Sequence, residues 1–424
     1  MFYLKIVVTS VAALLAWVGF VGFATLSGWW HSPITTSADP RVFMDAARGV
    51  VKAENAGNVG LVLIEDGKVY EEHFAGVSQQ IDRETLFPAA SMSKWITALG
   101  IMTLVQTGSI DLDAPVATYL TRWQLPPSEF NHDGVTVRGL LSHTSGLTDG
   151  LGFGDYEPDE ILPSLEESLL QPRASSGRDV QIAIGRTPGT EWDYSGGGYL
   201  ILQLIIEEVS GQSFESYMQA ALLQPLAMSR STYRYIGSIE NRSNSYDTNG
   251  QQATLYQYAA SAATGFSTSV ADLTRLVQAL LADGASSLPL RHESIKSMRK
   301  PNATLFGFDI WGLGTILYAP TESGDFVFGH DGQNEPAINS AVRINPDTGD
   351  AIIVLASGNQ SLATLLGFEW VFWQTGVPDF LGFGYVYERG VRIMLFGGVL
   401  ILVLTLLGTW WLRRDQWGQT KVPE

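Results

Sequence analysis

Uncharged, apolar residues form two long runs, one near each end of the chain. The first covers residues 6–30 and follows Lys5, and the second covers residues 393–412 and precedes Arg413 and Arg414. A helix rises ~1.5 Å per residue and the hydrocarbon core of a bilayer is ~30 Å thick, so each run is long enough to cross it. The pattern therefore predicts a transmembrane helix at each end.

Each of these helices has an alternative interpretation. The first run resembles a signal peptide, but no clear A-x-A cleavage site precedes Trp30, which favours an uncleaved anchor. The second run has the length of a buried core helix, but the Trp410–Trp411 pair and the Arg pair beyond it favour a span. Positive charge beside both runs predicts cytoplasmic termini, with the body between them on the extracytoplasmic side of the membrane.

Between the two runs, the hydrophobic pattern changes from strand-like to helical and back. Strand-like runs at 60–64 and 69–74 flank Asp66-Gly67, a hairpin signal. Apolar residues then recur at helical spacing, and strand-like runs return near the end of the body. The helical segments are 91–106, 199–209 and 270–281, and the late strands are 311–318, 325–329, 337–344 and 351–356. The aromatic, helix-like pattern of residues 361–375 predicts a helix that covers the sheet rather than a surface that binds a ligand.

This order predicts an α+β fold in which both ends of the body build one antiparallel sheet. Helices at roughly 90–290 would cover the sheet or form an inserted lobe. We expect an anchor or signal at 1–30, a Ser/Thr/Pro-rich linker at 31–44, one domain at 45–375, a transmembrane helix at 391–412 and a cytoplasmic tail at 413–424.

Charge and composition narrow the function. The chain has a net charge of −17 and no Cys, and residues 31–391 hold 41 of the 43 Asp and Glu but only 21 of the 26 Lys and Arg. An acidic body repels phosphate, which argues against nucleic-acid binding. Without Cys there are no disulfides, thiolate zinc sites or cysteine nucleophiles. H-E-x-x-H, G-x-x-x-x-G-K-[ST] and G-x-G-x-x-G are also missing, so no metal, nucleotide or other cofactor is expected. G-x-S-x-G is missing too, which argues against an α/β-hydrolase.

The sequence S-x-x-K occurs twice, at Ser91–Lys94 and at Ser297–Lys300. The second copy lies among charges and precedes Pro301, which predicts a solvated helix end. The first enters an apolar helix, where the N-terminal N–H groups favour developing negative charge on Ser91. Lys94 lies one turn on, on the same helix face.

Lysine usage supports the first copy. Lys94 is the only lysine between Lys68 and Lys296. An Arg cannot lose its proton near neutral pH, whereas a desolvated Lys can. Lys94 therefore fits a general base that activates Ser91 as a nucleophile, the alternative being a surface lysine that extends its amine to water.

The run Phe-Pro-Ala-Ala-Ser-Met-Ser-Lys at 87–94 resembles the serine β-lactamase and penicillin-binding-protein superfamily, on its class C and esterase-like side. Further stretches match that family's pattern in order over roughly residues 45–360. They are 108–113 with Pro115-Val116, Leu-Leu-Ser-His-Thr-Ser-Gly-Leu at 140–147, Pro-Gly-Thr at 188–190 before Tyr194-Ser195, and Gly-His-Asp-Gly at 329–332. The resemblance implies a β-lactamase/transpeptidase-like fold.

The resemblance also implies roles for particular residues. Ser91 would be the nucleophile and Lys94 its proton acceptor, while Tyr194 would move protons between nucleophile and leaving group with the help of a nearby cation. His330 and Gly332 occupy the third motif, and Gly332 would let the substrate backbone approach. The N–H of Gln333 would form an oxyanion hole with that of Ser91.

Other polar residues are interpreted as structural. His143 and its neighbours predict a hydrogen-bonded turn. The pair Asp111/Asp113 also predicts a turn rather than acid–base chemistry.

Two departures from the family pattern bear on the substrate. The second motif is commonly Tyr-x-Asn, but here it reads Tyr194-Ser195-Gly196, and His330 stands where many relatives have Lys. Both weaken the case for efficient β-lactam hydrolysis.

The sequence thus predicts a membrane-anchored serine hydrolase that cleaves a small ester, amide or peptide through an acyl-enzyme. The two anchors favour a substrate close to the membrane. A β-lactamase or D-Ala-D-Ala-type peptidase and a non-catalytic, acylation-competent sensor are the alternatives. The oligomeric state stays open.

Overall fold

The computed structural model describes residues 2–150, 154–174, 180–282 and 288–419. Its centre is an eight-stranded antiparallel sheet that takes strands from both ends of the body, as predicted. In spatial order the strands are β2 (Lys68–Ala75), β1 (Val59–Glu65), β10 (Asp350–Ser357), β9 (Ile338–Asn345), β8 (Phe326–Asn334), β7 (Ile316–Pro320), β6 (Phe308–Trp311) and β5 (Ala303–Leu305).

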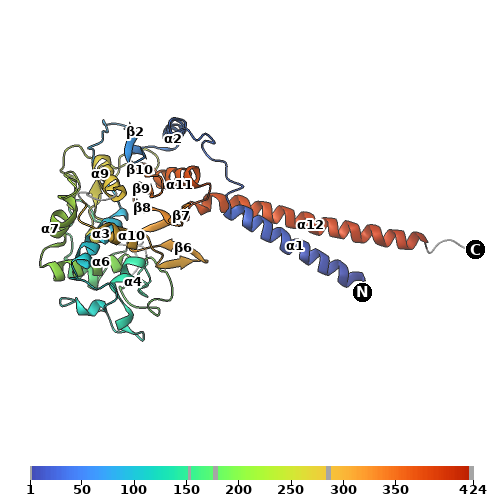
Figure 1. Ribbon diagram of the computed structural model, residues 1–424, viewed down its shortest axis with the longest axis horizontal. Coiled ribbons are helices and arrows are strands. Elements are labelled where there is room, and N and C mark those ends of the chain that lie inside the picture. The colour runs from blue at the N-terminus through green and yellow to red at the C-terminus, as the bar shows by residue number, and fades with distance from the viewer. Residues whose placement is uncertain (1, 151–153, 175–179, 283–287, 420–424) are drawn as a thin grey trace, which may run out of the picture.

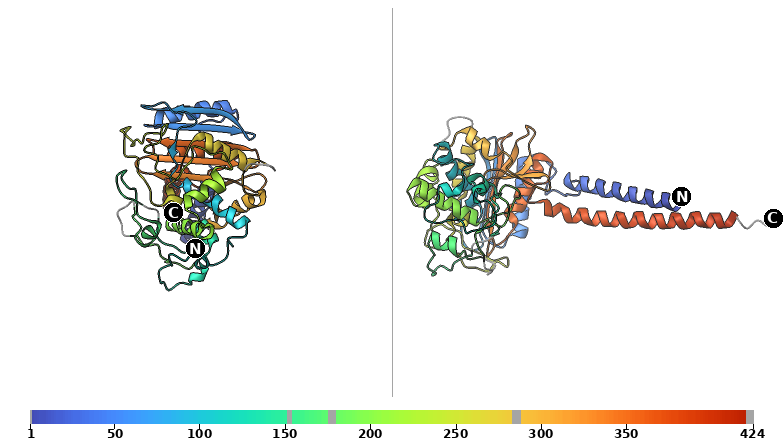
Figure 2. Two further views of the ribbon diagram at one scale, coloured as in Figure 1. Left: turned by 90° about the vertical axis from the view of Figure 1, so that its left-hand side faces the viewer. Right: turned by 90° about the horizontal axis from the view of Figure 1, so that it is seen from below.

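Side chains that alternate along each strand fill two separate cores. On β1, Leu61 and Leu63 face the core beneath α2 (Pro40–Glu54) and α11 (Leu362–Thr375), whereas Val62 and Ile64 face the opposite core. The opposite core belongs to an inserted helical lobe (Figures 1 and 2). The lobe contains α3 (Met92–Gln106), α4 (Val137–Ser142), α5 (Leu165–Leu170), α6 (Gly197–Ser210), α7 (Phe214–Met218), α8 (Ser261–Thr264), α9 (Val270–Leu281) and α10 (His292–Met298).

The central helix of the lobe, α3, is buried on all sides. Every residue from Met92 to Leu104 is buried, including the polar residues Ser93, Lys94 and Thr97. A helix that is apolar all round belongs in a protein interior. Lys94 is therefore not a surface lysine.

Three predicted boundaries need correction. The run 311–318 is not one strand, because Gly312 N–H donates to Thr315 O (2.8 Å) in a turn that separates β6 from β7. Strand β8 continues to Asn334, five residues beyond the predicted end. The predicted linker 31–44 ends early because Asp39 caps α2, accepting a hydrogen bond from Arg41 N–H (2.9 Å).

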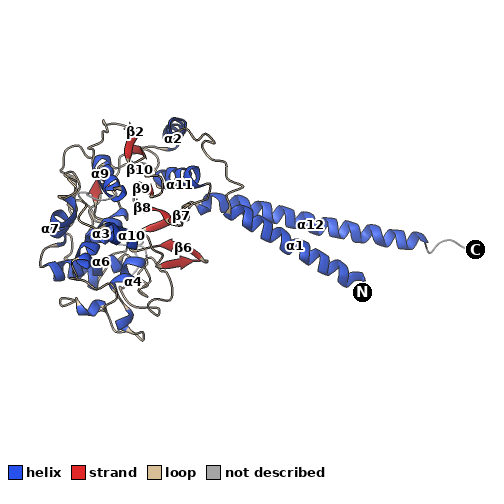
Figure 3. Ribbon diagram, viewed as in Figure 1, coloured by secondary structure: helices blue, strands red, loops and turns tan. Residues whose placement is uncertain are grey.

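The two terminal helices, α1 (Phe2–Leu26) and α12 (Phe383–Gln419), lie side by side and antiparallel (Figure 3). Trp17 Nε1 donates to Met394 O (3.0 Å), and Gly397 has no Cβ that would collide with the Trp17 ring. Both helices leave the body on the face of the sheet that carries α2 and α11 (Figure 2). Each is long and apolar enough to cross a membrane. Helix α12 starts eight residues before the predicted span at 391–412.

Candidate active site

The turn before α3 presents Ser91 at the start of the helix. The short strand β3 (Phe87–Pro88) pairs with β4 (Ser267–Thr268), and Ala89 N–H donates to Phe266 O (2.9 Å). Ala90 then takes a left-handed conformation, with φ of 48°, which costs a residue with a Cβ ~1–2 kcal/mol. Such strain concentrates at functional sites. Nothing in the sequence pattern had signalled it.

Ser93 holds this turn from inside. Its Oγ donates to Ala90 O (2.6 Å) and accepts from Phe266 N–H (2.9 Å). Ser93, the second variable residue of the S-x-x-K motif, thus fixes the backbone that carries Ser91. It is fully buried behind this turn and acts as a positioning residue.

Lys94 lies beside Ser91 and is nearly sealed from solvent. Its Nζ is 3.2 Å from Ser91 Oγ and donates to Ala263 O (2.9 Å), and the residue is only 3% exposed. Burial lowers the pKa of Lys94 to about 7, against an opposing attraction from Asp149. The neutral amine is therefore accessible at neutral pH.

Tyr194 completes the polar group around Ser91. Its ring centroid is 4.9 Å from Lys94 Nζ. Burial raises the pKa of Tyr194 above its usual value, and a hydrogen bond with Ser91 opposes this only partly. The nearby cation expected from the sequence is present, but Tyr194 stays a neutral phenol that can donate and accept a proton.

His143 supports Tyr194, in agreement with the structural interpretation of this residue. The two rings stack with centroids 4.3 Å apart, and His143 Nδ1 accepts from Ser195 N–H (3.1 Å). His143 itself is the left-handed residue that ends α4, with φ of 58°. Burial and the nearby Lys94 lower its pKa well below the ordinary value, so it is neutral.

Asp149 is a buried carboxylate that sequence reasoning missed. It accepts hydrogen bonds from Ser195 Oγ (2.6 Å) and from Gly197 N–H (2.7 Å). The middle residue of the second motif, Ser195, therefore bonds into the protein, and Gly196 lines the cavity at the position where the family pattern has Asn. No motif pointed to Asp149, because a single Asp in a loop has no distinctive spacing.

The third motif lies on a free strand edge. Strand β7 pairs with β8 only as far as Gly329, so within the described residues positions 330–334 pair with β9 alone. His330 Nδ1–H donates to Asp331 O (2.5 Å), while Nε2 has no partner among the described residues. Burial lowers the pKa of His330 to about 4. The His330 side chain is therefore uncharged at neutral pH.

Gly332 also allows two backbone segments to approach closely. A Cβ at this position would collide with Ala89 O, the carbonyl just before the Ser91 turn. Ser340 Oγ donates to that same carbonyl (2.8 Å). Gly332 thus allows β8 to pack against the nucleophile turn, and its role in admitting the substrate backbone stays a prediction.

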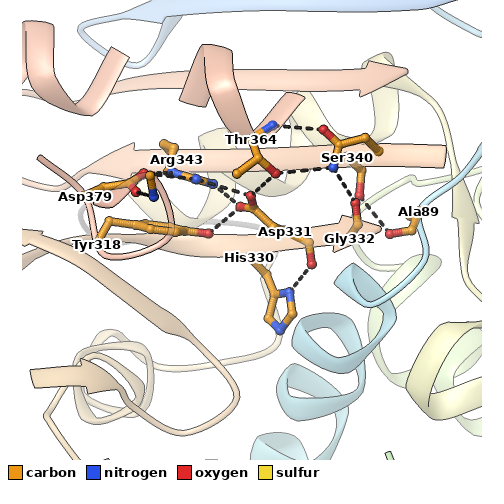
Figure 4. Close-up of polar contacts among 11 residues, drawn as sticks. Ala89, Tyr318, His330, Asp331, Gly332, Ser340, Arg343, Thr364 and Asp379 are labelled. Atoms are coloured by element: carbon orange, nitrogen blue, oxygen red, sulfur yellow. Dashed lines mark hydrogen bonds and ion pairs between the residues drawn. The ribbon is translucent and has the colours of Figure 1, made fainter. Parts of the chain in front are cut away.

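Beneath the third motif lies a buried network of charges (Figure 4). Arg343, fully buried, pairs with Asp331 and with Asp379, the latter at 3.1 Å. Asp331 also accepts from Tyr318 Oη (2.8 Å) and Thr364 Oγ1 (2.7 Å). The network holds β8 from the face opposite Ser91, and the charge of Arg343 is neutralised by its two partners.

All six predicted site residues line one cavity of about 700 Å³: Ser91, Lys94, Tyr194, His330, Gly332 and Gln333. The other lining residues fall into an apolar group and a polar group. Besides Gly196, the apolar group is Trp192, Ala263, Trp311, Ile316, Phe380 and Leu381. The polar group is Thr264, Asn334, Gln360 and Thr364 together with the acidic residues Asp331 and Glu335. Around Ser91 the cavity offers no permanently charged cation among the described residues.

The remaining candidates lie elsewhere. Ser297 Oγ bonds to Ser294 O (2.7 Å) within α10, and Lys300 is exposed, as expected for a solvated helix end. Asp113 pairs with Arg138 (2.7 Å) and donates its N–H to Asp111 Oδ1 (2.9 Å), which forms the predicted turn.

Comparison with known proteins agrees with this arrangement. Residues 43–366 match the family model described as Beta-lactamase. The chain belongs to the Beta-lactamase family. Curated proteins with similar sequences include penicillin-binding protein 4* of Bacillus subtilis, which is 31% identical over an alignment that covers 40% of this chain and 37% of the relative. Esterase EstB of Burkholderia gladioli is 30% identical over 34% of this chain and 38% of the relative. The alignments thus span little more than a third of each relative's length.

Solved structures place the family fold over most of the chain. The octameric penicillin-binding protein homologue from Pyrococcus abyssi superimposes with a TM-score of 0.67 at 24% identity, covering 83% of this chain and 80% of that one. SurE gives a TM-score of 0.61 at 26% identity, covering 80% and 76%. The predicted fold class is confirmed.

Proposed function

We propose that this member of the Beta-lactamase family is a membrane-anchored serine hydrolase that cleaves an uncharged ester through an acyl-enzyme on Ser91. The observation that carries the proposal is the 3.2 Å contact between Ser91 Oγ and a buried Lys94 whose pKa is about 7. An amine that is neutral at working pH and within hydrogen-bond reach of a serine is the arrangement a general base needs.

The chemistry follows from these positions. Neutral Lys94 accepts the Ser91 proton as Oγ attacks the carbonyl carbon. The backbone N–H groups of Ser91 and Gln333 would bind the resulting oxyanion. The proton returns to the leaving alkoxide through Lys94 or the neutral phenol of Tyr194, and the acyl-enzyme forms. Water, deprotonated by the same amine, then releases the acid and restores Ser91.

The electrostatics of the cavity favour an uncharged substrate. His330 is neutral, Arg343 is paired with two carboxylates, and Glu335 lies at the lining. A substrate carboxylate would meet the carboxylate of Glu335, and the described lining residues offer no permanently charged, unpaired cation to offset it. β-Lactams and peptides ending in D-Ala carry such a carboxylate, which this cavity disfavours. They are nevertheless the second candidate, because relatives are named penicillin-binding proteins.

We further propose that α1 and α12 cross the membrane and hold the body on its extracytoplasmic side. The support is the position of Lys5 and Arg413 at the far ends of the helices. Because the chain has no native Cys, a single Cys at Ile161, which is 94% exposed, would be a unique label. A membrane-impermeant maleimide should label Ile161→Cys in intact cells, and should label Lys5→Cys only after lysis. The reverse pattern would place the body inside.

The acyl-enzyme is the direct test of the reaction. Full-length protein in detergent is mixed with p-nitrophenyl acetate, quenched in acid and digested for mass spectrometry. We expect an acetyl group on the peptide that contains Ser91, and none in Ser91→Ala. A fluorescent penicillin is tested in parallel. Stable penicillin labelling of Ser91 with no acetyl-enzyme would replace the esterase by a penicillin-binding function, and labelling by neither reagent would rule out acyl transfer.

A further inference from the structure

The apolar part of the active-site cavity begins at the nucleophile. Tyr194 lies 5.7 Å from Trp311, centroid to centroid, and Trp192 lies 5.8 Å from Trp311. Trp192 then meets Phe380 at 6.5 Å. The aromatic wall formed by Trp192, Trp311 and Phe380 thus continues from the Ser91 end of the cavity to Leu381.

The far end of this wall is the root of a terminal helix. Phe380 and Leu381 immediately precede α12, which begins at Phe383. Phe380 N–H donates to Tyr318 O (3.3 Å), which fixes the segment to β7, and Leu381 remains 37% exposed. The apolar end of the cavity therefore opens where α12 leaves the body.

The same side of the body exposes further aromatic residues. The turn between β5 and β6 leaves Phe306 92% and Phe308 53% exposed, and Figure 1 shows β6 on the side from which α1 and α12 depart. Strand β6 has exposed Phe308 at one end and cavity-lining Trp311 at the other. Exposed Phe side chains beside apolar spans suit contact with a bilayer surface, where Trp, Phe and Leu of interfacial helices insert.

From this geometry, we infer that the aromatic wall is the binding site for the acyl chain of a membrane lipid ester, which enters from the bilayer beside α12. The inference rests on the proposed Ser91 esterase activity. An apolar chain would follow the first turns of α12, about 15 Å from the start of the predicted span to Leu381, and bury its end on the wall. The neutral side chains around Ser91 would then accept the ester group. The bond that breaks is the ester C–O bond of the lipid, the acyl group passes to Ser91 Oγ, and water releases it as a fatty acid.

The test measures acyl-chain selectivity. Full-length protein in phosphatidylcholine vesicles is given p-nitrophenyl acetate or octanoate, and the octanoate/acetate ratio of kcat/KM is determined, because this ratio cancels differences in the amount of active enzyme. Each buried methylene favours binding about fourfold. We expect the wild-type ratio to exceed about tenfold. In Trp192→Ala and Leu381→Ser it should fall at least about fivefold, from lost contact area.

Ile161→Ala is the matched control, since Ile161 is an exposed aliphatic residue outside the cavity, and its ratio should equal that of the wild type. Hydrolysis of acetate that depends on Ser91, together with a ratio near one that neither wall variant changes, would overturn the acyl-chain site and leave the hydrolase intact. If neither ester is hydrolysed, the esterase proposal fails and the lipid proposal fails with it.

Discussion

Two copies of the same four-residue pattern behave in opposite ways in this chain. The first, Ser91–Lys94, begins a helix that is buried on every side, and its lysine is 3% exposed. The second, Ser297–Lys300, ends an amphipathic surface helix, and its lysine is exposed. The pKa of Lys94 falls to about 7 because burial penalises the charged amine.

The comparison teaches that spacing brings a serine and a lysine together but does not make them reactive. The first copy also has a strained residue, Ala90, before the serine, and a second hydroxyl, Ser93, that holds the turn. In the second copy the serine hydroxyl bonds to its own helix. Burial of the lysine and the backbone geometry before the serine therefore distinguish the first copy from the second.

Removing each serine should give the largest contrast. Ser91→Ala should lower kcat for p-nitrophenyl acetate at least about 1,000-fold, since it removes the nucleophile. Ser297→Ala should change kcat less than about twofold, as expected for a surface substitution. Initial rates of full-length protein in detergent decide this. Equal rates in wild type and Ser91→Ala would refute the role of the first copy.

Substitutions of Lys94 and Lys300 should differ nearly as much in their effect on kcat. Lys94→Met removes the base and should cost about 100- to 10,000-fold in kcat. Lys94→Arg should be no better, because a guanidinium keeps its proton. Lys300→Met, its matched control, should be indistinguishable from wild type. Recovery of activity in Lys94→Arg would show that the amine acts only as a charge.

The pH profile sharpens the comparison further. If neutral Lys94 is the base, kcat/KM rises with pH, is half-maximal at about 7 and levels off above that value. Asp149 attracts the protonated amine, so Asp149→Asn should lower the pKa of Lys94 and move the rise to lower pH, by up to about one unit. Asp66→Asn, in the exposed β1–β2 turn, should leave the profile in place. A rise that begins only near pH 10 would contradict a buried base.

The smallest effect, and a change of sign, is expected when Gly replaces the residue before each serine. Ala90→Gly relieves a left-handed backbone and should raise the free energy of unfolding by about 0.5 kcal/mol, the strain removed less the added chain entropy. Lys296→Gly, in the helix before Ser297, should lower it by about 1 kcal/mol. Thermal unfolding in detergent measures both. Destabilisation by Ala90→Gly would mean that the turn carries no strain.

The fold and the proximity of Ser91 and Lys94 could be predicted from the sequence because both have local sequence signatures. Alternating strands, an apolar helix after Ser91 and the scarcity of lysine around Lys94 can all be read from neighbouring residues. The contacts that tune the site join distant positions instead, as when His143 stacks on Tyr194 and Asp149 bonds to Ser195. The same is true of Gly332, whose close neighbour Ala89 lies more than 200 residues away.

The ion pair between Arg343 and Asp379 has a consequence for how the molecule can be divided. Asp379 lies only four residues before α12, yet its carboxylate is fully buried against the arginine that also supports the strand of the third motif. A protease or a cloning boundary that removed the helix together with Asp379 would leave Arg343 with Asp331 alone and cost a buried charge-assisted contact of about 1.5–3 kcal/mol. A cut ahead of residue 379 would thus loosen the support of the third motif, whereas a cut inside the helix would leave that support in place.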